Sequence, residues 1–241
     1  MNYFDGMILE FFNRFSQRSW TFDSTIYLLA ETNLFRSGIV VTILWALWFT
    51  RDEEEALAET RRTVLASFAG SFVALLLAKG VITKILPFRL RPLHQPDSNF
   101  QFPFGVHKEI LEGWSSFPSD TATLAAGLVT GVLLISPRLG FFSIVYVFLV
   151  ILIPRIYLGF HYPTDILGGI LLGCVCVLLA NWWINKYKFT DPLLEWPEKY
   201  PRLFYGVFFF LSYQTADDFS DILSVGKFLL HTSKSVVNKI F

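Results

Sequence analysis

Three short stretches of the chain place charged side chains where an apolar segment meets a polar loop. They are Lys84 to Arg91-Pro92, then Pro118-Ser119-Asp120-Thr121, and then Arg155 with His161 and Asp165. Charge beside a membrane segment is costly, so its presence indicates a functional site. Lysine and arginine supply charge-assisted hydrogen-bond donors to phosphate oxygens. The residue types therefore predict a site for a phosphorylated compound at the edge of a membrane.

The third stretch has the residues of a covalent catalyst. His161 and Asp165 are four residues apart, and Pro163 suits the first turn of a helix that begins between them. In that geometry Asp165 accepts a hydrogen bond from one imidazole nitrogen, which leaves the other nitrogen free as a nucleophile. The alternative is that the two side chains only cap the helix. The cations in the neighbouring stretches favour the nucleophile.

The first two stretches suit the binding of the phosphate itself. Lys84 and Arg91 are seven residues apart, so both face one direction if the helix continues, although Pro87 and Pro92 indicate that it frays. Ser119 is a good N-cap, and the free backbone N–H groups of a helix N-terminus suit a phosphate. A simple cap at Ser119, and snorkelling of the cations to the membrane interface, are the alternatives.

Composition limits the class of protein. The 241 residues are 53% hydrophobic, include 26 Phe and have a formal net charge of zero. A soluble domain is normally less apolar and more charged, and the zero net charge argues against a nucleic-acid partner. Cys174 and Cys176 point to different faces of a helix, so we expect neither a disulfide nor a metal site from them.

Apolar runs are long enough to span, or nearly span, the hydrocarbon core of a bilayer, which needs about 20 residues. They cover roughly 35–50, 63–87, 120–136, 139–158 and 164–185. Residues 3–30 are interrupted by charges and form either a polar first span or an interfacial helix. We therefore expect an all-α fold, a polytopic membrane helix bundle with five or six transmembrane helices.

The chain divides into three parts on this interpretation. Residues 1–34 are an N-terminal amphipathic or first membrane helix, and residues 35–189 are the transmembrane core that carries the site. Residues 190–241 follow a change in composition and are expected to be an amphipathic, membrane-associated tail. A further span or a partner-binding helix is the alternative for the tail.

Charged loops predict the orientation in the membrane. The charged piece 51–62, Arg138, and Lys186 with Lys188 lie in short loops or just after an apolar run, so the positive-inside rule places them in the cytoplasm. The loops 88–118 and 159–163 then lie on the opposite face. The parity of the spans therefore brings all three charged stretches to one side of the membrane.

Taken together, the three stretches resemble the signature of the type 2 phosphatidate phosphatase (PAP2) superfamily, which reads Lys-x6-Arg-Pro, Pro-Ser-Gly-His and Ser-Arg-x5-His-x3-Asp. The likeness rests on Lys84, Arg91, Pro92, Pro118, Ser119, Arg155, His161 and Asp165. With the surrounding helices it covers about 35–185. In character the chain is closest to the undecaprenyl-diphosphatase-like members of that family.

The resemblance implies an integral membrane lipid phosphatase that needs no metal or other cofactor. It implies that His161 attacks phosphorus to form a phosphohistidine, that Asp165 orients the imidazole, and that water then releases phosphate. The residues expected to bind the phosphoryl group are Lys84, Arg91, Ser119 and Arg155, to which we add Thr121.

Two positions depart from the family pattern. Pro154 replaces the Ser that precedes Arg155, and Asp120-Thr121 replaces Gly-His, whose His is assigned in the family as the general acid. Thr121 cannot protonate a leaving group at neutral pH. General acid catalysis contributes about 10²–10⁴-fold, and it matters least when the leaving group is a phosphate, which departs as a stable anion. We therefore expect a diphosphate substrate, such as a polyprenyl diphosphate, rather than phosphatidate.

Asp120 is the nearest residue that could replace the missing acid, and we expect it to take part in catalysis, although a carboxylate beside a phosphate holds a proton poorly. His94 and His107, in the large outer loop, are the other candidates. Two further functions stay open: a phosphotransferase that hands the phosphoryl group to a lipid or sugar hydroxyl, and a degenerate site that only binds lipid phosphates. The short loops and the lack of an evident secretory leader favour a bacterial inner membrane, with the site on the non-cytoplasmic face.

Overall fold

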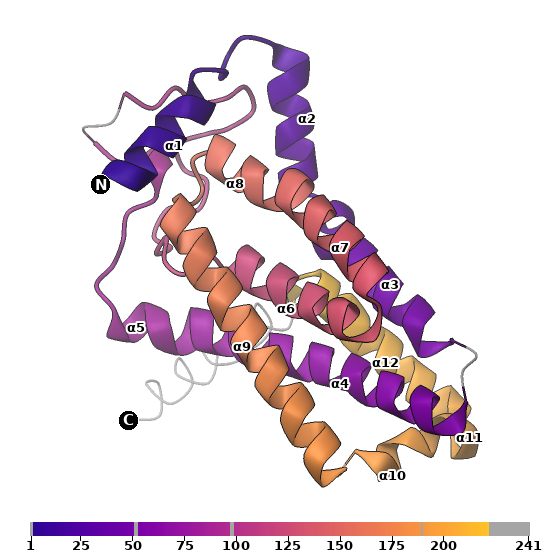
Figure 1. Ribbon diagram of the computed structural model, residues 1–241. Coiled ribbons are helices and arrows are strands. Elements are labelled where there is room, and N and C mark those ends of the chain that lie inside the picture. Colours follow the sequence, from indigo (N-terminus) through magenta and orange to yellow (C-terminus); the bar gives the residue numbers. More distant parts are fainter. Residues whose placement is uncertain (1, 51–52, 97–98, 189, 222–241) are drawn as a thin grey trace, which may run out of the picture.

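The computed structural model describes residues 2–50, 53–96, 99–188 and 190–221, and within these ranges the chain is helical and contains no β-strand. The main bundle consists of α4 (Glu54–Leu76), α6 (Asp120–Ile135), α7 (Pro137–Tyr146) and α9 (Pro163–Tyr187), as Figure 1 shows. The expected all-α fold is confirmed for the described residues.

The remaining elements extend or flank this bundle. They are α1 (Tyr3–Asn13), α2 (Trp20–Glu31), η1 (Leu34–Gly38), α3 (Ile39–Trp48), η2 (Leu77–Ile82), α5 (Thr83–Ile85), η3 (Pro92–His94), η4 (Val147–Leu152), α8 (Ile153–Tyr157), α10 (Asp191–Leu194), α11 (Trp196–Lys199) and α12 (Pro201–Ala216). The elements η1, η2 and η4 are π-helical turns, and each continues directly into the α-helix that follows it.

The core of the bundle lies along α6, which packs against both α4 and α9. Nearly every side chain of α6 from Thr121 to Val132 is buried. Small residues allow this close packing, because a β-carbon on Gly173 of α9 would lie only 2.2 Å from the backbone oxygen of Thr123. Close backbone approach at small residues is the usual basis of helix association in membranes.

Three helical stretches are long and apolar enough to cross a membrane, namely Glu54–Ile85, Pro137–Tyr157 and Pro163–Tyr187. A fourth span results if α2 and the following stretch Leu34–Trp48, which is bent away from it by 62°, form one crossing. Helix α6 is apolar but has only 16 residues. The described residues therefore support three or four spans, and the total of five or six stays a prediction.

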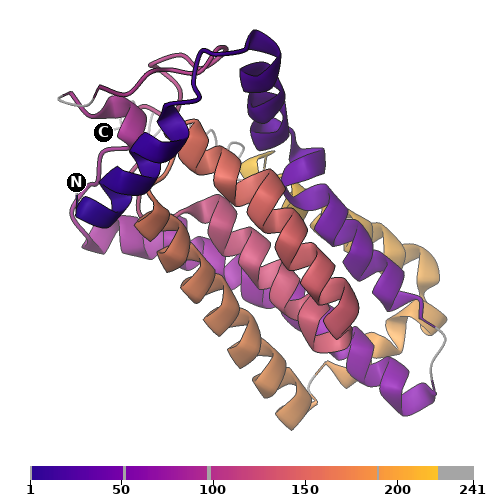
Figure 2. The ribbon, with the colours of Figure 1, turned by 45° about the horizontal axis from the view of Figure 1, so that its top comes forward.

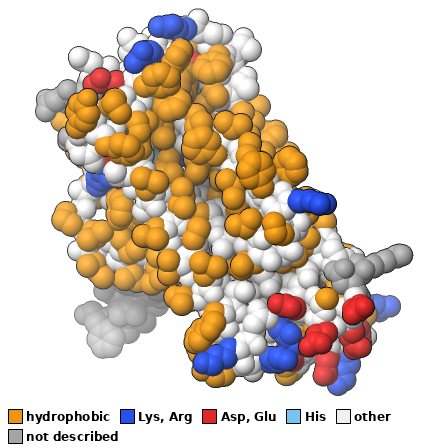
Figure 3. Space-filling view, in the orientation of Figure 1, with side chains coloured by type: hydrophobic (Ala, Val, Ile, Leu, Met, Phe, Trp, Pro, Cys, Tyr) orange, Lys and Arg blue, Asp and Glu red, His pale blue; other side chains and the backbone are white. Residues whose placement is uncertain are grey.

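Helix α4 begins earlier than the sequence suggested. Residues 54–62 were expected to be a charged loop, but they form the first turns of α4. The physical reason is that Glu54 and Glu55 lie in the first helical turn, where negative charge favours the positive end of the helix dipole. Glu54, Glu55 and Glu59 are exposed at this end of the bundle, where Figure 3 shows acidic and basic side chains at lower right, whereas Arg61 and Arg62 are partly buried.

The N-terminal region folds as two helices rather than one. Helix α1 crosses the end of the bundle opposite the start of α4 and packs against α8 and α9, and Figure 2 shows this end tilted toward the viewer. It exposes Tyr3, Phe4, Met7 and Phe11 on its outer side. This apolar face fits a helix that lies in the membrane interface.

Helix α12, in the expected tail, packs against α3 and α4. Phe204 and Phe208 are buried there against Trp48, with ring centroids 5.4 and 5.0 Å away. The opposite side of α12 exposes further apolar residues such as Leu203 and Phe210. The part of the predicted tail at 222–241 lies outside the described residues, so its amphipathic character stays a prediction.

Candidate active site

A cavity of about 300 Å³ lies at the end of the bundle where α6 begins and α8 ends. Its charged lining consists of the cations Arg36, Lys79, Arg91 and Arg155 and the carboxylates of Glu31 and Asp120, and His161 lies among them. All three charged stretches of the sequence contribute to this wall. The three stretches therefore meet at one end of the bundle, and their position on one side of the membrane stays a prediction.

The turn between α8 and α9 positions the histidine. Gly159 adopts a positive φ of 70°, which favours glycine, and a β-carbon there would also lie 2.5 Å from the ring of Phe100. The backbone N–H of His161 then donates to the oxygen of Arg155 at 3.3 Å. Because Pro163 begins α9 two residues later, the imidazole is fixed between two helix ends.

The hydrogen bonds of His161 define its tautomer. Its Nδ1 lies 2.8 Å from the backbone oxygen of Ser116, which can only accept, so Nδ1 carries the hydrogen. Its Nε2 therefore carries the lone pair, borders the cavity and accepts a hydrogen bond from Nη1 of Arg91 at 3.2 Å. Burial, together with the positive charge of Arg91, holds the pKa of His161 well below its usual 6.5. The ring is neutral at neutral pH, as a nucleophile must be.

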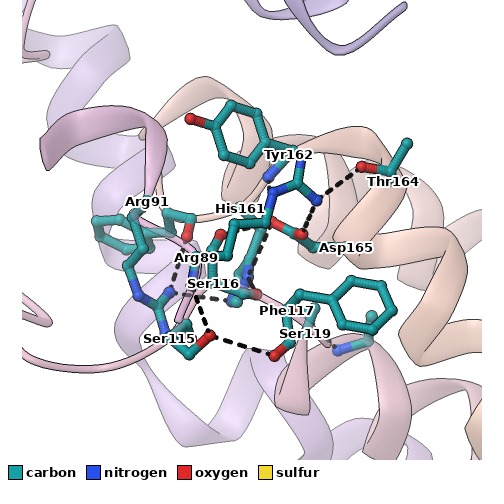
Figure 4. Close-up of polar contacts among 12 residues, drawn as sticks. Arg89, Arg91, Ser115, Ser116, Phe117, Ser119, His161, Tyr162, Thr164 and Asp165 are labelled. Carbon is teal, nitrogen blue, oxygen red and sulfur yellow. Dashed lines mark hydrogen bonds and ion pairs between the residues drawn. The ribbon is translucent and has the colours of Figure 1, made fainter. Parts of the chain in front are cut away.

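Asp165 does not contact the imidazole as the spacing suggested. Its nearest carboxylate oxygen lies 3.9 Å from Nδ1 of His161, which is too far for a hydrogen bond. Instead, Oδ2 of Asp165 accepts from the Ser116 hydroxyl and, at 2.8 Å, from the backbone N–H of Tyr162 (Figure 4). The expected direct pair is therefore wrong. The carboxylate caps α9 and holds Ser116, whose carbonyl in turn holds the histidine.

A further ion pair ties α1 to this arrangement. Arg89 donates 2.5 Å to Asp165 and 2.7 Å to Asp5, and both carboxylates are fully buried. Asp5 also accepts from the backbone N–H and the hydroxyl of Thr164, at the start of α9.

Arg91 donates most of its hydrogen bonds to backbone oxygens. It reaches the oxygens of Phe160, Trp114 and Ser115 at 2.7 to 3.3 Å, in addition to His161. It therefore clamps the loop that precedes α6 to the loop that precedes α9. Its expected contact with a phosphate stays a prediction.

Arg155 has a different environment. It donates to Glu31 at 2.8 Å and to the Thr121 hydroxyl at 3.2 Å, but its buried Nε–H has no hydrogen-bond partner among the described residues. The side chain is 5% exposed, so it does not snorkel to the membrane interface. An unpartnered, buried guanidinium donor beside a cavity is suited to an anion.

Two predicted phosphate ligands lie elsewhere. Lys84 is exposed in the last turn of the helix and does not line the cavity. Ser119 is fully buried, and its hydroxyl accepts from the backbone N–H of Ala122 at 3.3 Å, which is the N-cap that the sequence left as the alternative. The cavity has Lys79 instead, whose Nζ lies 3.3 Å from Oδ2 of Asp120.

The histidines of the outer loop are also outside the cavity. His94 contacts the backbone oxygen of Lys108 at 2.9 Å and borders a separate hollow, and His107 is exposed. Asp120 is the candidate that does reach the site, with Oδ1 at 3.9 Å from Nε2 of His161. Within the described ranges, no group of three or more His, Cys, Asp or Glu side chains is arranged to hold a metal ion.

Each π-helical turn precedes or contains a cavity cation. Arg36 lies in η1, Lys79 lies in η2, and Arg155 follows η4 within α8. A π turn inserts one residue and rotates the side chains that follow, and such turns are frequent at functional sites. Two of these cations, Arg36 and Lys79, lie within a π turn and were not among the residues expected to bind phosphate.

A family model described as the PAP2 superfamily matches residues 60–189, which is more than half of the chain. The chain belongs to the PAP2 superfamily. A curated relative, the bacitracin transport permease protein BcrC of Bacillus licheniformis, is 28% identical over 195 residues, which cover 79% of this chain and 85% of the relative. No solved structure matches the chain. This PAP2 protein is accordingly a helical membrane protein of a phosphatase family.

Sequence reasoning missed several residues of the site. Lys79 and Arg36 were visible as charges within or beside apolar runs, which is itself a functional signal. Glu31 and Ser116 carried no such signal, because only the fold brings them to Arg155 and His161.

Proposed function

We propose that this PAP2 protein removes the terminal phosphate of a lipid diphosphate, most simply a polyprenyl diphosphate, through a phosphohistidine on His161. The observation that carries the proposal is the neutral imidazole, with Nε2 aimed into a cationic cavity and Asp120 beside it. The carbonyl of Ser116 fixes the reactive tautomer.

In the first step Nε2 of His161 forms a bond to the terminal phosphorus, and the bond from phosphorus to the bridging oxygen breaks. The electron pair leaves with the lipid monophosphate. Arg155, whose Nε–H is unpartnered, stabilises the negative charge of the transferred group. Because the leaving group is a phosphate anion, the step proceeds without the proton that the family histidine would supply, and Thr121 at that position is tolerated.

In the second step a water attacks the phosphohistidine, the bond from Nε2 to phosphorus breaks, and inorganic phosphate leaves. Asp120 takes the proton of the water. Its Oδ1 lies 3.9 Å from Nε2, so the carboxylate lies beside the phosphoryl group that Nε2 would carry and accepts the proton of a water that attacks phosphorus on the side opposite Nε2. Lys79, at 3.3 Å, favours the ionised carboxylate that this role requires.

The volume of the cavity favours a lipid substrate whose head group enters the cavity while its chain stays outside. A volume of about 300 Å³ is at the lower end of ligand pockets. A second hollow of about 200 Å³ shares Lys79, Arg91, Trp114 and Asp120 with it and adds apolar side chains such as Ala78 and Phe88. We assign this second hollow to the first units of the lipid chain. The site then opens on the non-cytoplasmic face, away from the charged end of α4.

The experiment is phosphate release by the purified protein, in chelator, from polyprenyl diphosphate, polyprenyl monophosphate and phosphatidate. We expect release from the diphosphate, abolished in His161→Ala. Release only after addition of an acceptor alcohol would make the protein a phosphotransferase. No reaction under either condition would contradict an enzymatic function.

A further inference from the structure

Arg36 is a cavity cation that neither the sequence signature nor the reaction above uses. It lies in the π-helical turn η1, and its side chain is 16% exposed. Its buried Nε–H has no hydrogen-bond partner in the described part of the chain, as is also true of Arg155. The cavity wall therefore holds two guanidinium groups that each have an unused donor.

The segment that follows α12 supplies a counter-charge to Arg36. Asp218 forms an ion pair with Nη2 of Arg36, and neither carboxylate oxygen has another hydrogen-bond partner among the described residues. Asp218 and Phe219 both adopt positive φ, at 53° and 55°, so this turn is sharp. Ser220, two residues on, lines the cavity.

The cavity wall carries more positive than negative charge. The cavity wall has four cations and two carboxylates. Arg155 is matched by Glu31, and Lys79 by Asp120, each through a direct ion pair. Arg36 repels the nearby Arg155, and the anion beside it comes from outside the wall. An anionic ligand of the cavity would compete for the same guanidinium.

We propose that Arg36 determines specificity for diphosphates by binding the phosphate that His161 does not attack, and that Asp218 occupies Arg36 while the cavity is empty. The inference rests on the proposed function for the choice of substrate, but the binding site itself does not. A monophosphate occupies only the anion site beside His161 and Arg155. The second phosphate of a diphosphate occupies a further anion site at Arg36 and displaces the Asp218 carboxylate from it.

Binding measurements test the role of Arg36 independently of catalysis. The probes are methylenediphosphonate, which is not hydrolysed, and inorganic phosphate, titrated calorimetrically into the full-length protein in detergent and chelator. Arg36→Gln alone leaves Asp218 unpaired and could fail to fold, so the main variant is Arg36→Gln with Asp218→Asn. A charge-assisted hydrogen bond corresponds to about tenfold to a hundredfold in affinity. We expect that loss for methylenediphosphonate, with phosphate binding nearly unchanged.

Asp218→Asn alone should do the opposite. It removes the competitor and leaves Arg36, so the affinity for methylenediphosphonate should rise several-fold. The matched control is Asp221→Asn, because Asp221 follows in the same segment but is exposed and accepts from the Tyr213 hydroxyl at 3.3 Å. Equal losses for both probes in the double variant, or no change for either, would overturn the role of Arg36. An Asp218→Asn variant that binds methylenediphosphonate no more tightly than the Asp221→Asn control would overturn the competition.

Activity then separates this inference from the proposed function. The double variant should lose kcat/KM for polyprenyl diphosphate through a higher KM, by about the same factor as the binding loss. If the wild-type protein hydrolyses no substrate, the proposed function fails while the binding result still decides the role of Arg36. If hydrolysis occurs and the double variant keeps its KM, Arg36 is not a substrate ligand.

Discussion

The role of Asp120 gives the sharpest prediction. Asp120→Asn keeps the size of the side chain and an oxygen that can accept from the backbone N–H of Thr121, which lies 2.8 Å from Oδ1. It removes the base that lies 3.9 Å from Nε2 of His161. General base catalysis is worth about 10²–10⁴-fold. Because a diphosphate needs no acid in the first step, the whole loss should fall on the second.

The expected behaviour is a burst. With substrate labelled at the terminal phosphate, the Asp120→Asn protein should form one phosphohistidine per site at close to the wild-type rate. It should then turn over about 10²–10⁴-fold more slowly. Rapid-quench sampling measures both phases, and the phosphohistidine is recognised by its stability in alkali and lability in acid.

Two controls sharpen the assay. His161→Ala should give no labelled protein, because the nucleophile is absent. Glu31→Gln removes the other cavity carboxylate, which pairs with Arg155 at 2.8 Å, and should not cause the intermediate to accumulate. Slow turnover of Asp120→Asn without a burst would place Asp120 before phosphoryl transfer, and unchanged turnover would exclude it as the base. Either result refutes the reasoning.

Three further predictions follow from the site and the core. Because the pKa of His161 is lowered, nitrogen NMR of labelled histidine should show a neutral ring below pH 6.5. The free energy of unfolding should decline as pH falls below 6.5, because only the unfolded chain then binds the extra proton. A titration midpoint of His161 at or above pH 6.5 contradicts this. Arg89→Gln should lower the free energy of unfolding by about 1–3 kcal/mol, because two buried carboxylates lose their cation. Adding Asp5→Asn to this variant removes one of the unpaired carboxylates and should recover part of the thermal stability measured in detergent. Gly173→Ala should cost about 1–3 kcal/mol in the same melts, whereas Gly206→Ala, where no atom lies within 4 Å, should be neutral or stabilising.

Much of the scaffold follows from local sequence. The long apolar runs predict the helices α4, α6, α7 and α9, and helix-starting residues predict two of their first turns, at Pro163 and at the N-cap Ser119. The order of the charged stretches along the chain also predicts that His161, Arg155 and Asp120 share one site. These properties depend on hydropathy, helix capping and the parity of crossings, which the sequence encodes directly.

The contacts within the site depend on the tertiary structure. The spacing of His161 and Asp165 suggested a direct pair, but a third element brings Ser116 between them. The spacing of Lys84 and Arg91 assumed a regular helix, but the π-helical turn η2 and the helix end at Ile85 put Lys79 in the cavity and leave Lys84 outside. Local periodicity cannot encode such a change of register.

Contacts between residues far apart in the sequence are the ones that the sequence left most open. Arg89 meets Asp5 across 84 positions, and Arg155 meets Glu31 across 124. Each pairing joins a charge that is expensive to bury with a counter-charge from a different helix. The sequence by itself determined that a cationic, histidine-bearing site lies at one end of a membrane bundle. Only the packing of α1, α2 and the turn after α12 onto that end decided which charges neutralise one another and which donors remain for a ligand.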